Sequence, residues 1–167
     1  MNSSELNNLR EWKKWNQSVI WQAPLASGIY VFRLADGKTI HRLEGDSDIL
    51  YIGCSTKIRN RLKRHLKVMN VERNVAYRLQ RVEQQIGHLE VSWKSYDTAD
   101  RAKVAERLLL AKYEADHIEF PPLNRSESGK RSRMVEELLK LEPGNMQDLL
   151  AAVAKIRSGE IKIRRST

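Results

Sequence analysis

The chain has 167 residues, a net charge of +9 and an isoelectric point near 9.8. This length fits one compact domain with an appendage, and the single cysteine, Cys54, excludes an intrachain disulfide framework and a cysteine-built zinc site. Charged residues make up 31% of the chain, and no apolar run approaches the roughly 18 residues that a spanning helix needs. We therefore expect no membrane partner, and the lack of a signal-peptide pattern favours a cytoplasmic protein.

The first part of the chain predicts a helix followed by a hairpin. Residues 3–20 place apolar side chains at three- and four-residue spacing, which is typical of an amphipathic helix, and Pro24 ends it. Residues 28–34 and 49–52 are rich in β-branched and aromatic side chains, which favour strands. Together they predict an antiparallel hairpin with a long connection over residues 31–50.

Helices and one strand alternate in the next part. Residues 57–69 and 72–86 each predict a helix. Residues 89–96 alternate apolar with polar side chains, the period of a half-buried strand, and a further helix should end near His117.

This order predicts a mixed α/β (α+β) fold, in which a small, three-stranded, mainly antiparallel sheet is flanked by helices. We expect an N-terminal amphipathic helix in residues 1–24 and the mixed domain in residues 25–125. Residues 126–167 should form a basic linker and a C-terminal helical hairpin.

Positive charge is concentrated in the middle of the sequence. From Lys57 to Arg81 there are nine basic residues against one acid, Glu72, and this stretch carries most of the net charge. Such a concentration indicates a polyanion site, although an exposed helix face that only keeps the protein soluble is the alternative. The residues expected to contact nucleic acid are Lys57, Arg59, Lys63, Arg64, Lys67, Arg73, Arg78, Arg81, Arg125, Lys130, Arg131 and Arg133.

Two tyrosines lie on the two predicted strands, each with a glycine nearby. Tyr30 follows Gly28-Ile29, and Tyr51 precedes Ile52-Gly53. On adjacent strands both phenols could project from one face of the sheet. Cross-strand packing is the alternative role for such tyrosines.

Three further residues are candidates for chemistry. Arg61 and His65 are four residues apart and share one face of the predicted helix, where a guanidinium suits a phosphate. Their alternatives are a surface arginine and a packed histidine. Glu106 lies beside an apolar run, where a carboxylate is costly to bury unless it is paired or binds a cation. A surface pairing with Lys103 or Arg107 is its alternative.

These motifs together resemble the GIY-YIG nuclease family. The tripeptides stand at residues 28–30 and 51–53, and the helix sequence IRNRLKRHL follows them. Glu106 on an apolar helix and the phrase Pro-Pro-Leu-Asn, which ends at Asn124, complete the pattern. The resemblance covers roughly residues 27–125.

The resemblance implies a catalytic set around one phosphodiester. Tyr30 would be the general base or would align the attacking water, and Tyr51 would complete the phenolic pair. Arg61 would bind the phosphate and stabilise its developing charge. His65 would support the proton network, and Asn124 would close the site by hydrogen bonding.

Glu106 would be the only protein ligand of one divalent cation. Mg²⁺ suits such a site, because it keeps several waters and needs only one or two carboxylates, and Mn²⁺ is the alternative. To act as a base, Tyr30 needs nearby cations that lower its pKa from the usual value near 10. These constraints favour hydrolysis by direct attack of water.

Two functions remain open at this point. The first is a DNA endonuclease of a restriction, repair or mobile-element type, and the second is a non-cleaving nucleic-acid-binding module on the same fold. The connection over residues 31–50, with Lys38, His41 and Arg42, is either a surface decoration or a flap that contacts DNA. The sequence leaves both monomer and homodimer open.

Overall fold

The computed structural model describes residues 9, 11–67 and 74–124. The expected linker and helical hairpin of residues 126–167 lie outside the described residues. So do five of the basic residues expected to contact nucleic acid: Arg73, Arg125, Lys130, Arg131 and Arg133. None of the helices in the described ranges is long and apolar enough to cross a membrane.

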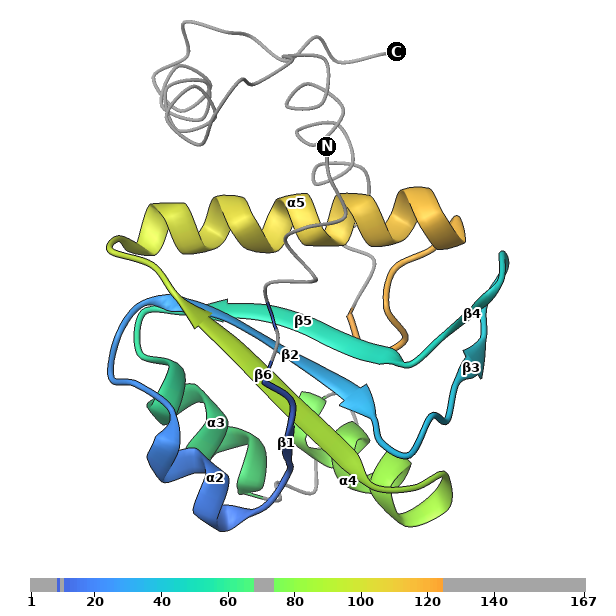
Figure 1. Cartoon of the computed structure of the whole chain (residues 1–167), viewed down its shortest axis with the longest axis horizontal. Coiled ribbons are helices and arrows are strands. Elements are labelled where there is room, and N and C mark those ends of the chain that lie inside the picture. The colour runs from blue at the N-terminus through green and yellow to red at the C-terminus, as the bar shows by residue number, and fades with distance from the viewer. Residues whose placement is uncertain (1–8, 10, 68–73, 125–167) are drawn as a thin grey trace, which may run out of the picture. The chain divides into compact units, whose positions relative to one another are not determined.

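The sheet is antiparallel throughout and has the strand order β1-β6-β2-β5. Its strands are β1 (Lys13–Lys14), β2 (Gly28–Leu34), β5 (Ile49–Ser55) and β6 (Leu89–Ser95). The three long strands are those that the sequence predicts, although β5 continues three residues beyond the expected end at Ile52. The mixed α+β class is confirmed, with β5 as one edge of the sheet (Figure 1).

Helices cover both faces of this sheet (Figure 1). The helix α5 (Ala99–His117) packs on one face, against apolar side chains such as Ile29 and Val31. The opposite face carries Tyr30 and Phe32, and is covered by three shorter helices. These helices are α2 (Gln17–Gln22), α3 (Ile58–Leu66) and α4 (Val75–Gln85). Successive side chains of β2 point to opposite faces of the sheet, so they contribute to two separate apolar layers.

The expected N-terminal helix over residues 3–20 is wrong for the part that the structure describes. Lys13–Lys14 is a strand that pairs with β6, and the Trp15 N–H donates to Leu89 O at 2.8 Å. The helix begins only at Gln17, because the Asn16 side chain accepts the N–H groups at its first turn. Trp12 packs on the α5 side and Trp15 on the other, as residues three apart do in extended chain.

The long connection forms a small hairpin that is fixed to the rest of the domain. Its strands are β3 (Ile40–His41) and β4 (Asp46–Ser47). Arg42 has a side chain only 9% exposed, donates to Phe120 O at 2.7 Å and pairs with Glu119. The Lys38 Nζ donates to Ile86 O at 2.7 Å. These contacts favour a structural role for Arg42 and Lys38 over contact with DNA.

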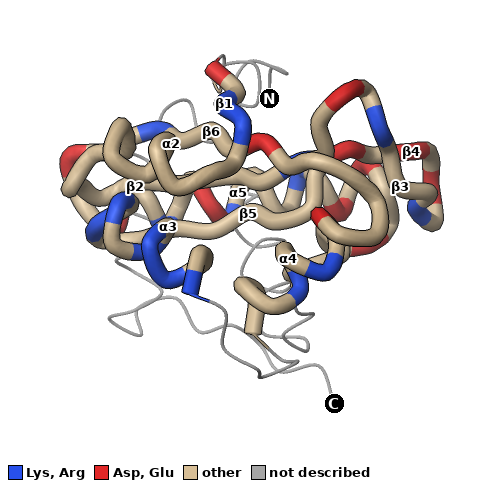
Figure 2. The backbone as a smooth tube through the Cα atoms, turned by 90° about the horizontal axis from the view of Figure 1, so that it is seen from below, with Lys and Arg blue, Asp and Glu red and all other residues tan. Residues whose placement is uncertain are grey.

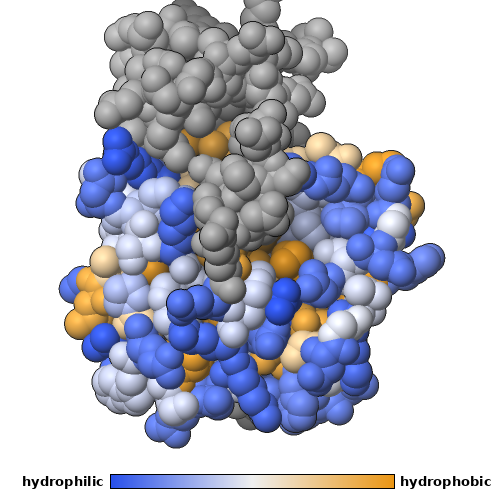
Figure 3. Space-filling view, viewed as in Figure 1, coloured by the Kyte–Doolittle hydropathy of each residue, from blue (hydrophilic) through white to orange (hydrophobic). Residues whose placement is uncertain are grey.

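The charged residues of the described surface are unevenly distributed. Lys and Arg lie along α3 and on α4, whereas the hairpin of β3 and β4 carries acidic residues (Figure 2). On the face seen in Figure 3 the described residues are mainly hydrophilic, and hydrophobic ones form small separate patches. The helix that follows β5 is therefore the basic side of the domain.

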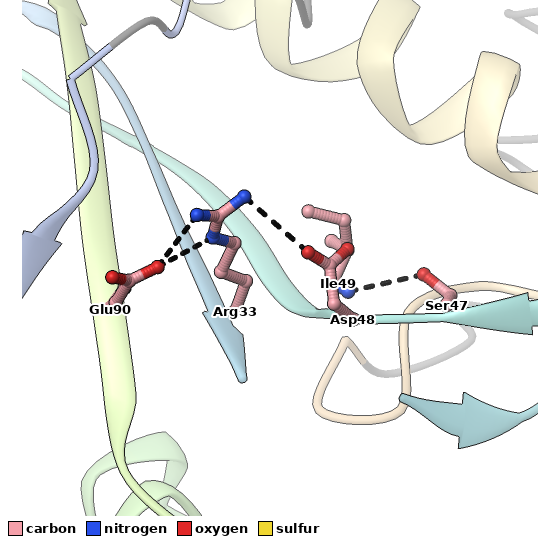
Figure 4. A network of polar contacts seen from close by, with 5 residues as sticks. All are labelled: Arg33, Ser47, Asp48, Ile49 and Glu90. Carbon is pink, nitrogen blue, oxygen red and sulfur yellow. Dashed lines mark hydrogen bonds and ion pairs between the residues drawn. The ribbon is translucent and has the colours of Figure 1, made fainter. Parts of the chain in front are cut away.

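A polar cluster fixes the three long strands at the end away from Gly28 (Figure 4). The Arg33 guanidinium donates to Glu90 on β6 at 2.7 and 2.8 Å, and lies 3.5 Å from Asp48, just before β5. The same guanidinium lies 4.1 Å from the Trp12 ring centroid. One side chain thus fixes β2, β6, the start of β5 and the N-terminal segment.

The end of α5 gives a stability prediction. Ile118 caps this helix in the left-handed region, with φ of +62°, and its side chain is 61% exposed. A residue with a Cβ is strained there by about 1–2 kcal/mol, and a β-branched one gains little in return at the surface. We expect Ile118→Gly to raise the free energy of unfolding by about 1 kcal/mol, measured by urea denaturation.

Ile86 is the matched control. It caps α4 with φ of −113° in the right-handed region and is 41% exposed. Because no strain is relieved there, Ile86→Gly should not raise the free energy of unfolding. An equal gain in stability at both positions would contradict the prediction.

Candidate active site

The two glycines of the tripeptides make room for close packing. Gly53 pairs with Tyr30 across the strands, and a Cβ on Gly53 would lie 2.8 Å from the Tyr30 Oη. A Cβ on Gly28 would lie 2.2 Å from Lys94 O and 2.6 Å from the Ile58 Cδ1. Gly53 therefore provides the space for the Tyr30 ring, and Gly28 lets the first residue of α3 pack on the sheet.

Both phenols face α3, as expected for adjacent strands. The ring centroids of Tyr30 and Tyr51 are 5.9 Å apart, and the planes are tilted by 38°. Tyr30 is only 1% exposed, whereas Tyr51 is half-buried. The pair thus joins a fully buried phenol to one that reaches toward solvent.

His65 comes to the same place from α3. Its Nε2 lies 3.0 Å from the Tyr30 Oη, and its ring also packs against Phe32 and Tyr51. Burial, and then the positive charge of Arg61, lower the His65 pKa to about 4. The imidazole is therefore neutral at pH 7, so that Nε2 accepts a hydrogen bond in one tautomer and donates in the other.

The pKa of Tyr30 is raised well above its usual value, first by burial and then by the neighbouring Tyr51. Arg61 acts in the opposite direction but does not outweigh burial. Burial also raises the pKa of Tyr51, while its hydrogen bond with Tyr30 lowers it. The lowered Tyr30 pKa that general-base catalysis needs is therefore not supplied by the described residues themselves.

Arg61 lies one turn before His65 on α3 and is half-buried. Its charge lowers the pKa values of Tyr30, Tyr51 and His65, so it acts electrostatically on all three rings. Its guanidinium forms no hydrogen bond or ion pair with another residue in the described ranges. The N–H donors of its guanidinium are therefore free to bind a ligand.

Asn124 lies at the outer edge of β5. Its Oδ1 accepts the Ile52 N–H at 2.9 Å, and its Nδ2 donates to Ile52 O at 2.8 Å. Next to it, the Leu123 N–H donates to Leu50 O at 2.9 Å. Each end of the Asn124 amide makes one hydrogen bond with the strand, so Asn124 positions β5.

Glu106 contacts the same edge of β5 at Cys54, two residues after Ile52. Its Oε1 accepts the Cys54 N–H at 3.2 Å, and its Oε2 lies 3.1 Å from the Cys54 Sγ. Burial, and then the Glu106 charge, raise the Cys54 pKa to about 12, so the thiol keeps its proton and donates it. The carboxylate comes from α5 and is half-buried. After burial, its negative charge is among the causes that raise the pKa of both Tyr30 and Tyr51.

The carboxylate of Glu106 has the chemistry that a single hard cation needs. A carboxylate has about four acceptor positions, and the two contacts with Cys54 leave others free. No group of three or more His, Cys, Asp or Glu side chains could hold a metal in the part of the chain that the structure describes. One carboxylate with water and phosphate oxygens is the set that Mg²⁺ accepts.

The basic residues expected to contact nucleic acid have different environments. Lys57, Arg64, Lys67 and Arg81 are exposed. Arg59 is different, because its Nε donates to Ala23 O at 2.7 Å and ties α3 to the chain after α2. Lys63 lies over the Trp21 ring, and Arg78 is half-buried with partners of its own.

Cys54 has a role that the sequence analysis did not predict. It belongs to the apolar layer under α5 and also donates to Glu106 through its thiol and backbone. One signal in the sequence could have indicated this role. Cys54 is two residues after Ile52 on the same strand, and alternate residues of an edge strand direct their backbone N–H and C=O groups to the same side.

No family model and no curated protein matches the chain. Its structure is similar to one solved structure, the GIY-YIG N-terminal endonuclease domain of UvrC from Thermotoga maritima bound to its catalytic divalent cation, magnesium. The two chains share 21% sequence identity with a TM-score of 0.42, over 66% of this chain and 100% of the other.

The neutral His65 gives a pH prediction. Its pKa is about 4 in the folded chain and near 6.5 when unfolded, so the unfolded chain binds more protons between these values. The free energy of unfolding should therefore fall as pH falls from 6.5 to 4, by at most about 3 kcal/mol from this residue. Urea denaturation at a series of pH values measures the slope.

Two variants separate His65 from the other acid-titrating groups. His65→Gln should flatten the fall in stability between pH 6.5 and 4. His88→Gln changes an exposed histidine and should leave the fall as in the wild type. The assignment fails if both variants keep the same slope.

Proposed function

We propose that the chain is a metal-dependent DNA endonuclease that hydrolyses a phosphodiester bond by direct attack of water. One observation carries this proposal: the phenols of Tyr30 and Tyr51 meet His65 on α3, the helix that also carries Arg61, while Glu106 contacts β5 at the residue after Gly53. A guanidinium, a carboxylate and a phenol in one place are the groups that phosphodiester hydrolysis needs.

The scissile phosphate would lie at the edge of β5 beside Gly53. Arg61 would donate its planar fork to the non-bridging oxygens and stabilise the charge that develops on them. Gly53 has no side chain at this point, so the phenols come close to the strand backbone. The half-buried Tyr51 would contact the phosphate from the α3 side.

Tyr30 and His65 would handle the proton of the attacking water. The Tyr30 oxygen would align the water, while the phenolic O–H donates a hydrogen bond to Nε2 of the neutral His65 across the 3.0 Å contact. Since the described residues raise the Tyr30 pKa, Tyr30 acts as a base only with further positive charge nearby. A divalent cation would supply this positive charge, so catalysis by Tyr30 as a base would require the metal.

Glu106 would hold one divalent cation, Mg²⁺ by preference and Mn²⁺ as the alternative. When bound, this cation would supply positive charge to the phosphate and the leaving oxygen. Cys54 would orient the carboxylate through its two hydrogen bonds, and Asn124 would keep β5 in place. Both are positioning residues in this scheme.

DNA would bind along the basic side of α3. Residues 49–67 contain six basic side chains and no acid. Three of them, Lys57, Arg64 and Lys67, are exposed. Binding through such residues should weaken steeply as salt is added, because phosphate contacts release counterions.

A module that binds without cutting would have no use for Glu106. A carboxylate beside a phosphate repels it unless a cation lies between them. We therefore expect Glu106→Ala to abolish plasmid cleavage in Mg²⁺ while DNA binding survives. Glu106→Gln should have the same effect and keeps an oxygen for the Cys54 N–H.

Glu114→Gln is the control, because it removes an acid further along the same helix. It should cleave as the wild type does. The assays are plasmid nicking with and without Mg²⁺, and electrophoretic binding in chelator. Normal cleavage by both Glu106 variants would refute the metal assignment.

Arg61 gives a second kinetic prediction. Arg61→Lys keeps the charge but loses the planar fork, and it should lower the single-turnover cleavage rate by about 10²–10³-fold. Arg64→Lys changes an exposed arginine on the same helix and should leave the rate within about twofold of the wild type. Equal losses in both variants would assign Arg61 to general DNA binding instead.

A further inference from the structure

A second candidate site lies between α2 and α3, away from the phenol pair. A groove of about 260 Å³ is lined by Gln17, Ile20, Trp21, Lys63, Leu66 and Lys67. Trp21 is 59% exposed, an unusual state for the largest aromatic side chain. The Lys63 Nζ lies 4.0 Å from its ring centroid. The groove thus combines an exposed aromatic ring with ammonium groups.

The charged side chains on the two helices that line this groove are all basic. Residues 12–35, which include α2, contain no acidic side chain, and neither do residues 49–67, which include α3. Lys67 is exposed at the groove, and Arg64 is exposed on the same helix. A flat apolar ring with a basic rim fits a ligand that carries flat rings on an anionic backbone.

Single-stranded nucleic acid has this chemistry. An unpaired base offers a free face for stacking, whereas a base within a duplex is already stacked on both sides. Stacking on an aromatic side chain is tolerant of sequence, and lysines bind the neighbouring phosphates. The Trp21 ring can stack on a base, because its side chain is exposed and Lys63 covers only one face of the ring.

We propose that Trp21, Lys63 and Lys67 form a site for one unpaired nucleotide of a DNA strand. Trp21 stacks on the base, and the two lysines bind the adjoining phosphates. The inference rests on the proposed function, which it deepens, because the substrate becomes DNA with a single-stranded part close to the cut. Lys63 and Arg61 belong to the same helix, α3, but face different sides of it, so a strand that contacts both would pass around the helix.

The test is binding without cleavage. Fluorescence anisotropy in chelator gives the Kd for a labelled single-stranded oligonucleotide and for the matched duplex. We expect Trp21→Ala to raise the single-strand Kd by about 5- to 100-fold and the duplex Kd by less than about twofold. Trp21→Phe keeps a stacking face and should stay within about threefold of the wild type.

Leu25→Ala is the matched control, because Leu25 is 57% exposed just after α2 and does not line the groove. It should bind both DNA forms as the wild type does, and the melting temperatures of all variants report on folding. An unchanged single-strand Kd in Trp21→Ala overturns the proposal. So does an equal loss for both DNA forms, or a change from dimer to monomer on sedimentation, which would make the groove a self-association surface.

Plasmid cleavage in Mg²⁺ separates this inference from the proposed function. If the wild type fails to cut but binds single strands in a Trp21-dependent way, the proposed nuclease activity is contradicted and the proposed nucleotide site is supported. If the wild type cuts and Trp21→Ala binds single strands as tightly as the wild type does, the proposed nuclease activity is supported and the proposed nucleotide site is contradicted.

Discussion

The hydrogen bond between Tyr30 and His65 connects three parts of the chain that are distant in sequence. The Tyr30 ring crosses from the central strand β2 to lie over Gly53 of β5, and its hydroxyl meets His65 from α3. Both residues are almost fully buried, so the contact must be satisfied within the protein. The position of α3, and with it Arg61, therefore depends on a contact that the glycine permits.

The outer edge of β5 is the other constraint. Residues on one face of a sheet cannot reach those on the other except around an edge, and β5 is such an edge. The phenols lie on the α3 side, and Glu106 comes from α5 on the opposite side. The candidate site consequently forms where the sheet ends, next to the residue without a side chain.

Short-range patterns in the sequence predicted much of this arrangement. The strands, α5, and the common face of Tyr30 and Tyr51 follow from residue type and period. The N-terminal helix was wrong because its apolar spacing also suits an extended segment that packs one tryptophan on each side of a sheet. Only the tertiary pairing with β6 distinguishes the two.

The roles of Asn124, Cys54 and Arg42 depend on contacts between residues far apart in the chain. No local pattern states that an amide will occupy the free edge of a strand, or that a thiol will donate to a carboxylate. The same holds for the Tyr30 pKa, because burial decides its direction and burial is a property of the whole fold.

The contacts along β5 also bear on how copies of the chain meet. An edge strand with unpaired backbone groups is a template for adding another strand, and proteins block such edges. Here Leu123, Asn124 and Glu106 hydrogen-bond to outward backbone groups of Leu50, Ile52 and Cys54, so two residues of the candidate site also hinder the addition of a further strand at this edge. The blocking of this edge and the geometry of the candidate site thus depend on the same hydrogen bonds.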